Sequence, residues 1–441
     1  MGRTLVVDGI NQIGQKIKVS GWVNSFRSHG KIVFIDLRDR SGLLQIVFSK
    51  PELIKGAKDL RNEWVVEVEG LVGERPEKLW NKDLATGKIE LDAESLTVLA
   101  RAEELPFDTA RPALEVTLPT LLDYRPLSLR HPSVAPIFKV QEIIADSFRT
   151  TLKSLDFAEA FFPTLVPTAT EGGAQVFHVD YFEKDAYLSQ SPQFYKQISL
   201  GAFERVFTLA HAYRAEPSVT TRHLTEYVGL DAEMAFIESY LEVISVADKV
   251  IRGIFKDVGT KAGDILKAFG VTVPKTASET PKIKLREALE IIYQRTGRDS
   301  RNEPDLAPED EREIGRYAAE EFGSEIIFVT HYPTKKRPMY TYPDPESPEE
   351  TQSFDLIGRG VEWLTGSRRI NNYEQLVSNI KKWGNDPAKF ETYLQAFKYG
   401  MPPEGGFCFG LERITQNILG LENVRQASLF PRDMNRVDIT L

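Results

Sequence analysis

Cysteine is almost absent from this 441-residue chain: Cys408 stands alone, so an internal disulfide framework is excluded. The six histidines show no close metal-ligand spacing, which argues against a structural zinc site. Long apolar runs are also missing, and the first residues lack a charged start followed by an apolar stretch. The sequence therefore predicts neither a membrane span nor a secretory signal, and we expect a cytoplasmic protein.

The chain has neither a P-loop nor a dinucleotide-binding glycine motif, so a nucleotide would have to bind in another way. Its 41% hydrophobic and 27% charged residues are ordinary for a globular protein, and its length favours two domains. The first fifty residues hold eight Lys or Arg against three Asp, although the whole chain carries a net charge of -9. This asymmetry leaves nucleic-acid contact by the N-terminal part as an open hypothesis.

Residues 17–99 contain five short stretches of alternating apolar and polar residues, with an apolar-rich segment between the third and the fourth. This order predicts a five-stranded β-barrel of the OB type over residues 1–104, with a fragment of a β-sandwich as the alternative. Prolines then recur through residues 105–132. Because a proline disfavours helical backbone in the residue before it, we expect this segment to be an extended, non-helical hinge.

Residues 133–441 are predicted to form the second domain. A helical pattern over residues 134–155 opens it, and strand patterns then follow one another with helices interspersed less regularly than in β-α-β units. One of the predicted strands covers residues 338–344. This order favours an α+β fold with a mainly antiparallel sheet.

The stretch YRAEPSVTTRHLTEY sets a charged turn between two apolar strand patterns. If its second arm is a strand, the period of two places Tyr227, Asp231 and Glu233 on one face and apolar residues on the other. Arg214 and Glu216 share a face of the first arm. Such a set suits a nucleotide triphosphate, and a surface hairpin with cross-strand ion pairs is the alternative.

Another candidate segment is a short helix after YLSQSPQFYKQ. Ser191 is the predicted N-cap and Pro192 the first helical residue, after which Gln193, Lys196 and Gln197 share a face. A lysine that points into a pocket could bind an anionic group of a substrate. An exposed helix face is the alternative interpretation.

Asp355 and Glu362 are seven residues apart, which would put them on opposite faces of an unbroken strand. A bulge or turn at Gly358 and Gly360 would let both serve one site, where two carboxylates and substrate phosphates could hold Mg²⁺. Two unrelated surface acids are the alternative. Further along, Arg413 lies in the first turn of a predicted helix, where free N–H groups already favour an anion.

Three segments in this order resemble the signature motifs of class II aminoacyl-tRNA synthetases of the aspartyl, asparaginyl and lysyl subgroup. They are FAEAFFPTLVPTATEGGA with Pro167 (motif 1), the charged hairpin described above (motif 2) and GGFCFGLERITQNILGLENVRQASLFPRD (motif 3). The resemblance covers nearly the whole chain. It implies an N-terminal OB-fold domain that binds the anticodon, a C-terminal catalytic domain with an antiparallel sheet flanked by helices, and a homodimer built across motif 1.

The resemblance also implies which residues act. Those implied for ATP are Arg214, Glu216, Arg222, His223, Tyr227, Glu362 and Arg413, of which Arg214 and Arg413 are catalytic. Those implied for aspartate are Glu171, Gln193, Lys196, Asp231 and Arg369, and those for magnesium are Asp355 and Glu362. Those implied for the anticodon are Arg27, Phe34 and Gln45, with a place in the barrel core as the alternative for Phe34.

The implied reaction activates aspartate with ATP and then transfers the aspartyl group to tRNA-Asp. The substrate carboxylate attacks the α-phosphorus, Mg²⁺ and arginines stabilise charge as pyrophosphate leaves, and the aspartyl group passes to the tRNA 3′ end. Lys196 and Arg369 favour aspartate because neutral asparagine would leave two buried cations without a counter-charge. Asn371 and Pro217 depart from the usual pattern, at positions where histidine and an acidic residue are common.

Several alternatives remain open at this point. One is that the chain charges tRNA-Asn as well as tRNA-Asp. The others are an asparaginyl-tRNA synthetase, a paralogue that forms free asparagine from aspartate, and a catalytically silent tRNA-binding relative.

Overall fold

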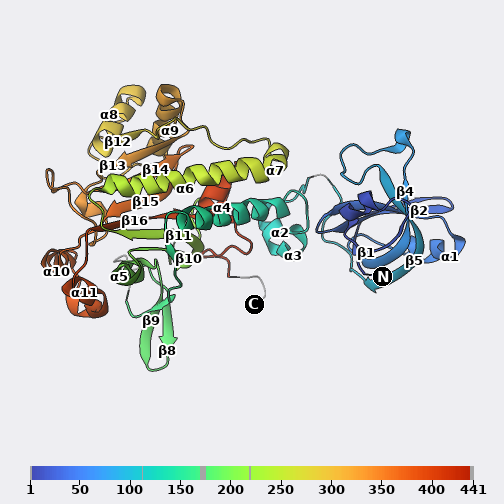
Figure 1. Ribbon diagram of the computed structural model, residues 1–441, viewed down its shortest axis with the longest axis horizontal. Coiled ribbons are helices and arrows are strands. Elements are labelled where there is room, and N and C mark those ends of the chain that lie inside the picture. The colour runs from blue at the N-terminus through green and yellow to red at the C-terminus, as the bar shows by residue number, and fades with distance from the viewer. Residues whose placement is uncertain (1, 112, 169–174, 218–219, 438–441) are drawn as a thin grey trace. The chain divides into compact units, whose positions relative to one another are not determined.

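The computed structural model describes residues 2–111, 113–168, 175–217 and 220–437 (Figure 1). Contacts between Cα atoms divide the chain into two compact units. The first comprises Met1–Leu121 with His131–Ser133, and the second comprises Leu122–Arg130 with Val134–Leu441. Each unit has an apolar core of its own.

The first unit is a closed five-stranded barrel, as the alternating sequence predicted. Its strands, in barrel order, are β1 (Lys16–His29), β2 (Ile32–Asp39), β3 (Gly42–Phe48), β5 (Ile89–Ala100) and β4 (Val65–Glu74). The apolar-rich segment after β3 forms helix α1 (Pro51–Lys58). On β2, Val33 and Ile35 are fully buried inside the barrel, whereas Phe34 between them is only partly buried, since successive side chains alternate across a strand.

The expectation of a non-helical hinge is wrong. Residues 105–132 contain the two short helices α2 (Leu118–Asp123) and α3 (Arg125–Ser128). Pro119 and Pro126 are the second residues of these helices. A proline is tolerated there because the N–H groups of the first turn have no partner within the helix, so the prolines of this segment do not prevent helix formation.

The second unit is built around one eight-stranded sheet, mainly antiparallel, which confirms the predicted α+β class. In sheet order its strands are β12 (Lys282–Lys284), β13 (Ile326–Thr330), β14 (Ser353–Gly358), β15 (Val361–Arg368), β16 (Glu404–Gly410), β11 (Glu226–Ala235), β10 (Arg205–Tyr213) and β6 (Ala158–Glu159). Only the outermost pairs, β12 with β13 and β10 with β6, are parallel. The predicted strand at 338–344 is wrong, because this segment forms only isolated bridges, at Thr341 and Pro343.

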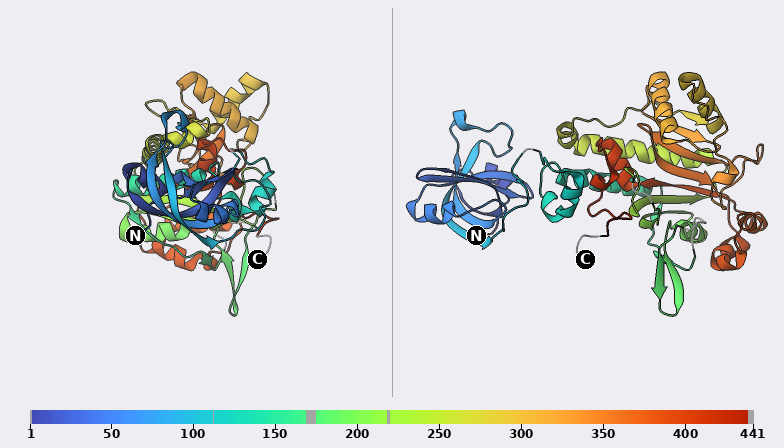
Figure 2. Two further views of the ribbon diagram at one scale, coloured as in Figure 1. Left: turned by 90° about the vertical axis from the view of Figure 1, so that its right-hand side faces the viewer. Right: turned by 180° about the vertical axis from the view of Figure 1, so that it is seen from behind.

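A small three-stranded sheet lies beside the large one and was not predicted. It contains β7 (Leu165–Val166), β9 (Lys184–Leu188) and β8 (His178–Tyr181). The β8–β9 hairpin extends away from the body of the second unit (Figures 1 and 2).

Helices cover the sheet unevenly. After α2 and α3 they are α4 (Ala135–Lys153), α5 (Gln193–Phe203), α6 (Tyr240–Lys261), α7 (Gly263–Ala268), α8 (Leu285–Thr296), α9 (Pro308–Phe322), α10 (Tyr373–Lys382), α11 (Glu391–Lys398) and α12 (Leu411–Ile418). The long helices α4 and α6 lie side by side over one face (Figure 1). None of the helices in the described ranges is long and apolar enough to cross a membrane.

Candidate active site

The β10–β11 hairpin carries the first group of site residues. Its register pairs Ala212 with Tyr227 beside the charged turn. Further along β11, Leu230 packs into the apolar core formed with α4 and α6, whereas Asp231 and Glu233 contact α5. The predicted division of this strand into an apolar and a polar face is therefore confirmed from Leu230 onward. The apolar face packs against α4 and α6, and the polar face lies on the opposite side of the sheet.

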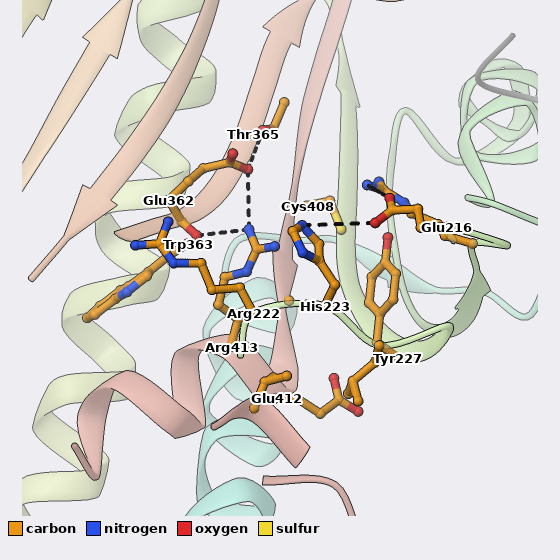
Figure 3. A pocket seen from close by; sticks show the side chains of 14 residues that line it. Glu216, Arg222, His223, Tyr227, Glu362, Trp363, Thr365, Cys408, Glu412 and Arg413 are labelled. Atoms are coloured by element: carbon orange, nitrogen blue, oxygen red, sulfur yellow. Dashed lines mark hydrogen bonds and ion pairs between the residues drawn. The ribbon is translucent and has the colours of Figure 1, made fainter. Parts of the chain in front are cut away.

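A cleft lies beside the turn of this hairpin (Figure 3). Its lining includes every residue that the resemblance implied for ATP: Arg214, Glu216, Arg222, His223, Tyr227, Glu362 and Arg413. These residues come from the hairpin, from β15 and from α12. The fold thus brings three segments that are distant in sequence to one cleft.

Two arginines of the cleft lie against neighbouring site residues. The guanidinium carbon of Arg214 is 5.5 Å from the centre of the Tyr227 ring, which is within cation–π range. Arg413 Nη1 donates a 3.0 Å hydrogen bond to the backbone carbonyl of Glu362 and lies 3.7 Å from its carboxylate (Figure 3). Both guanidinium groups are thereby held at the wall of the cleft.

Arg222 has a partner that the sequence did not reveal. Its Nη1 atom is 2.8 Å from the carboxylate of Glu311 on α9. Burial raises the pKa of Glu311 to about 7, although Arg222 opposes the rise. Burial also lowers the pKa of His223, which lies 4.0 Å from Glu216, and Arg413 lowers it further. Burial and the neighbouring arginines therefore disfavour a positive charge on His223, although Glu216 raises its pKa.

Asp355 and Glu362 meet because β14 and β15 form a hairpin with a bulge. The chain reverses after Gly358, and the register then shifts by one residue at Trp363. This extra residue turns Glu362 to the side that Asp355 and Thr365 occupy, since a bulge changes the alternation of a strand. The Thr365 hydroxyl lies 2.9 Å from the Asp355 carboxylate and 3.0 Å from that of Glu362.

The Asp355 carboxylate lies near one positively charged side chain, Arg337, and one negatively charged side chain, Glu362. Arg337 Nη2 lies 2.7 Å from the second carboxylate oxygen of Asp355. Burial raises the pKa of Asp355 to about 6; Arg337 opposes the rise and Glu362 adds to it. The two acids and Thr365 thus bring more acceptor oxygens together than one hydroxyl proton can satisfy. An oxygen-rich pair of this kind suits a hard divalent cation.

A second pocket adjoins the cleft and shares Arg214, Tyr227, Thr365 and Cys408 with it. Its wall also contains the guanidinium groups of Arg337 and Arg369 and the carboxylate of Asp231, and Gln193 of α5 lies beside them. Three guanidinium groups and one carboxylate at the wall are opposite in sign to the two carboxylates and the ammonium group of a dicarboxylic amino acid. Arg337 and Arg369 each also pair with a carboxylate of the protein.

Lys196 is buried behind this pocket, where it shares a charged network with Arg369 of the pocket wall. The expectation that neutral asparagine would leave these two cations without a counter-charge is wrong, because carboxylates of the protein already pair with both. Lys196 Nζ is 2.8 Å from Asp231 and 3.0 Å from Glu233, and Arg369 Nε is 2.7 Å from Glu233. Burial opposes the charge of Lys196, but the two carboxylates outweigh it and raise its pKa. Arg369 Nη2 also contacts the Gln193 side chain at 3.4 Å. The structure thus joins four of the five residues implied for aspartate; the fifth, Glu171, lies outside the described residues.

Two interpretations of the α5 region are wrong. The helix begins at Gln193 with Pro192 at the N-cap position and no side-chain cap, so Ser191 does not cap it. Its polar face is also not exposed: Gln193, Lys196 and Gln197 are all buried. The strands β10 and β11 and the helix α11 pack against α5, which sequence alone did not show. At the unusual position Asn371, the side chain donates a 3.1 Å hydrogen bond to the backbone carbonyl of Met401.

Several residues of the site were not predicted to act in it. They are Glu311, Arg337, Glu404 and Glu412. Glu233 was expected on the polar face of β11, two residues after Asp231, but it was not assigned to a ligand. Glu412 lies next to Arg413 in the segment that resembles motif 3, whereas Glu311, Arg337 and Glu404 come from segments with no distinctive local pattern. Only the folded chain shows the contacts of these residues.

The residues implied for the anticodon lie on the outer surface of the barrel. Arg27 pairs with Phe34 across β1 and β2, and Asp36 pairs with Gln45 across β2 and β3. Arg27 reaches Asp36 at 3.2 Å, and the Phe34 ring meets that of His29 edge-on at 6.2 Å between centres. Phe34 lies outside the barrel core, so the core alternative for this residue is wrong. The three predicted residues therefore share one patch of three adjacent strands.

This chain belongs to the class II tRNA synthetases of the D, K and N group, since the family described as "tRNA synthetases class II (D, K and N)" matches residues 117–434. The family described as "OB-fold nucleic acid binding domain" matches residues 17–99. The two matches agree with the two units of the fold.

Three relatives are similar to this chain over nearly its whole length. The chain is 41% identical over 436 residues to the aspartate–tRNA(Asp/Asn) ligase of Thermus thermophilus, with 99% of each covered, and 40% identical over 432 residues to that of Aeropyrum pernix, with 96% of each covered. It is also 40% identical over 433 residues to the aspartate–tRNA(Asp) ligase of Thermococcus kodakarensis, again with 96% of each covered.

Two solved structures show the same architecture. A putative aspartyl-tRNA synthetase from Leishmania major has a TM-score of 0.91 and 28% identity, covering 99% of this chain and 95% of that one. Asparaginyl-tRNA synthetase from Pyrococcus horikoshii, complexed with asparaginyl-adenylate, has a TM-score of 0.87 and 30% identity, with 97% of each chain covered.

Proposed function

We propose that this protein is an aspartate–tRNA ligase, which activates aspartate with ATP and transfers it to tRNA. One observation carries the proposal: a pocket walled by Arg214, Arg337, Arg369 and Asp231 adjoins a cleft that contains the predicted ATP residues. The relatives named above, at about this length and identity, are aspartate–tRNA ligases. Aspartate fits the pocket with Arg337, Arg369 and Asp231 by charge, and the wall that this pocket shares with the cleft would hold the α-carboxylate of aspartate next to the α-phosphate of ATP.

The proposed reaction needs no nucleophile from the protein. The α-carboxylate of aspartate attacks the α-phosphorus of ATP and pyrophosphate leaves, after which the tRNA 3′-terminal hydroxyl attacks the aspartyl-adenylate and AMP leaves. Arg214, at the wall shared by the two pockets, would stabilise charge that develops on the α-phosphate. Arg222, His223 and Arg413 would bind the outer phosphates, and Tyr227 would stack under the adenine.

Mg²⁺ fits the pair of acids on the β14–β15 hairpin. Asp355 and Glu362 offer hard oxygen ligands around one shared hydroxyl, that of Thr365. No group of three or more His, Cys, Asp or Glu side chains that could hold a metal occurs within the described residues. Phosphates and water would therefore supply the remaining ligands, and a bound ion would neutralise charge on the phosphates.

In the first unit, the patch of Arg27, Phe34 and Gln45 is proposed to bind the anticodon. A partly buried aromatic ring beside a guanidinium group is a suitable platform for an unstacked base. The relatives from Thermus thermophilus and Aeropyrum pernix are named for both tRNA-Asp and tRNA-Asn, and that from Thermococcus kodakarensis for tRNA-Asp alone. We propose tRNA-Asp as a substrate, with tRNA-Asn as a second one to be tested.

A homodimer is proposed from the resemblance of residues 157–174 to motif 1. In the described part of this segment, Phe161 is 87% exposed and Leu165 is 43% exposed. A partner chain packed on motif 1 would cover these two apolar side chains. Light scattering after size-exclusion chromatography should therefore give twice the mass of the chain, and a monomer at micromolar concentration would contradict this part of the proposal.

Amino-acid-dependent exchange of pyrophosphate into ATP tests the activity. Aspartate should support exchange and asparagine should not. Exchange with asparagine alone would instead indicate an asparaginyl enzyme, and inactivity with both, beside intact tRNA binding, would indicate a silent relative. Charging purified tRNA-Asp and tRNA-Asn side by side with aspartate then decides the tRNA specificity.

A further inference from the structure

Glu404, the first residue of β16, is fully buried and contacts Arg369, which lines the pocket proposed for aspartate. Its Oε1 atom accepts a 2.6 Å hydrogen bond from Gln197 Nε2 on α5, and its backbone carbonyl accepts a 2.9 Å hydrogen bond from the N–H of Arg369. Glu404 therefore ties the helix that carries Lys196 to the segment that carries Arg369. Nothing in the local sequence PPEGGF indicates such a role.

The charges around Glu404 are already balanced without it. Lys196 and Arg369 are cations, Asp231 and Glu233 pair with them as anions, and all four are buried. No ion pair joins Glu404 to a cation among the residues that the structure describes. An ionised Glu404 would thus leave one uncompensated negative charge in the network, which is costly in a buried site.

The immediate neighbours of Glu404 agree with a neutral side chain. Burial raises its pKa well above the usual value, and the carboxylate of Glu233 raises it further, while Arg369 opposes the rise. Gln197 uses its amide nitrogen on Glu404, and its amide oxygen accepts hydrogen bonds from Gln193 and from the Tyr393 hydroxyl. The Oε1 atom of Glu404 thus accepts a hydrogen bond, whereas its Oε2 atom has no hydrogen-bond partner among the described residues. Oε2 is therefore the oxygen that can carry a proton.

We propose that Glu404 is a positioning residue that stays protonated at Oε2 and so keeps the buried network neutral, which allows the pocket to prefer aspartate over asparagine. This inference rests on the proposed function. A negative charge on Glu404 would repel the side-chain carboxylate of aspartate and would not repel the amide of asparagine. At this depth such a charge would lower the preference for aspartate by about tenfold or more.

Glu404→Gln is the informative variant, because glutamine has the same size and cannot ionise. Its side chain can still accept the hydrogen bond from Gln197 and donate toward Glu233. In pyrophosphate exchange, the KM for aspartate and the preference for aspartate over asparagine should stay within about threefold of the wild type. Glu404→Ala also leaves the network neutral but leaves Gln197 without its acceptor, so it should raise the KM for aspartate by about tenfold through lost positioning and should keep the preference for aspartate. Glu391→Gln, on the exposed surface of α11, is the matched control.

Infrared difference spectroscopy gives a reading that a merely structural role would not change. The wild type minus Glu404→Gln spectrum at neutral pH should contain the carbonyl band of a protonated carboxyl group, which the Glu391→Gln difference spectrum should lack. A carboxylate band in its place would overturn the inference. So would a Glu404→Gln enzyme that is folded but has lost the preference for aspartate.

The two proposals fail in different ways. If the wild type shows no exchange with aspartate, the proposed function fails, and the infrared measurement still reports the protonation of Glu404. If the wild type is active with aspartate but Glu404→Gln is not selective, only the role of Glu404 fails.

Discussion

Replacing Glu412 by glutamine should make the second unit less sensitive to alkaline pH. Glu412 is the second residue of α12, and both of its carboxylate oxygens lie near the backbone N–H of Val228 on β11, at 3.1 and 3.2 Å. Its side chain thus connects the helix that carries Arg413 to the strand that carries Tyr227. Burial raises the pKa of Glu412 to about 7, although the Val228 N–H opposes the rise.

The sign of the effect follows from proton linkage. The pKa in the folded chain, about 7, is above the ordinary 4.5, so between these values the folded chain holds a proton that the unfolded chain has lost. The contribution of Glu412 to the free energy of unfolding is therefore fully present below pH 4.5 and is lost as the pH rises through about 7. The full change is about 3 kcal/mol, of which about 2.5 kcal/mol falls between pH 5 and pH 8.

Glu412→Gln removes this titration while keeping one acceptor for the Val228 N–H. The free energy of unfolding, from urea titrations at pH 5 and pH 8, should change with pH by about 2.5 kcal/mol more in the wild type than in the variant. Other titrating groups are common to both proteins and cancel in the difference. Glu422→Gln, at an exposed position, should behave as the wild type does. An identical pH dependence for wild type and Glu412→Gln would refute the reasoning.

Three further predictions concern the proposed ligands. Tyr227→Ala should raise the KM for ATP about tenfold or more through lost stacking, whereas Tyr227→Phe should stay within about twofold, as pyrophosphate exchange would report. Phe34→Ala should raise the KM for tRNA about tenfold without changing pyrophosphate exchange, so an equal loss in both assays would contradict an anticodon role. Asp355→Asn should raise the magnesium concentration needed for half-maximal exchange at least about tenfold. An unchanged magnesium requirement would remove Asp355 from the proposed metal site.

Local pattern predicted much of the architecture and the main groups of the site. The alternation of the first hundred residues was enough for a barrel, because side-chain direction in a strand depends only on the parity of the position. The same rule separated Asp231 and Glu233 from Leu230 on β11. The order of three motifs indicated a family that the comparison with known proteins then confirmed.

Local patterns gave a wrong result in two segments. Ser191 and Pro192 looked like a helix start, yet the helix begins one residue later with its polar face buried. The recurring prolines of residues 105–132 suggested an extended chain, but those of α2 and α3 occupy the first turns, where they are tolerated.

The sequence by itself determined the alternating faces of the strands, the α+β class and the kinds of side chain available for a nucleotide and an anionic amino acid. These depend on short-range periodicity, which the order of residues contains. Only the tertiary structure decided that Asp355 and Glu362 share one hydroxyl through a bulge, that Arg222 pairs with Glu311, and that Glu404 lies among charges already balanced. Contacts between distant segments set burial and charge, and no local pattern encodes them.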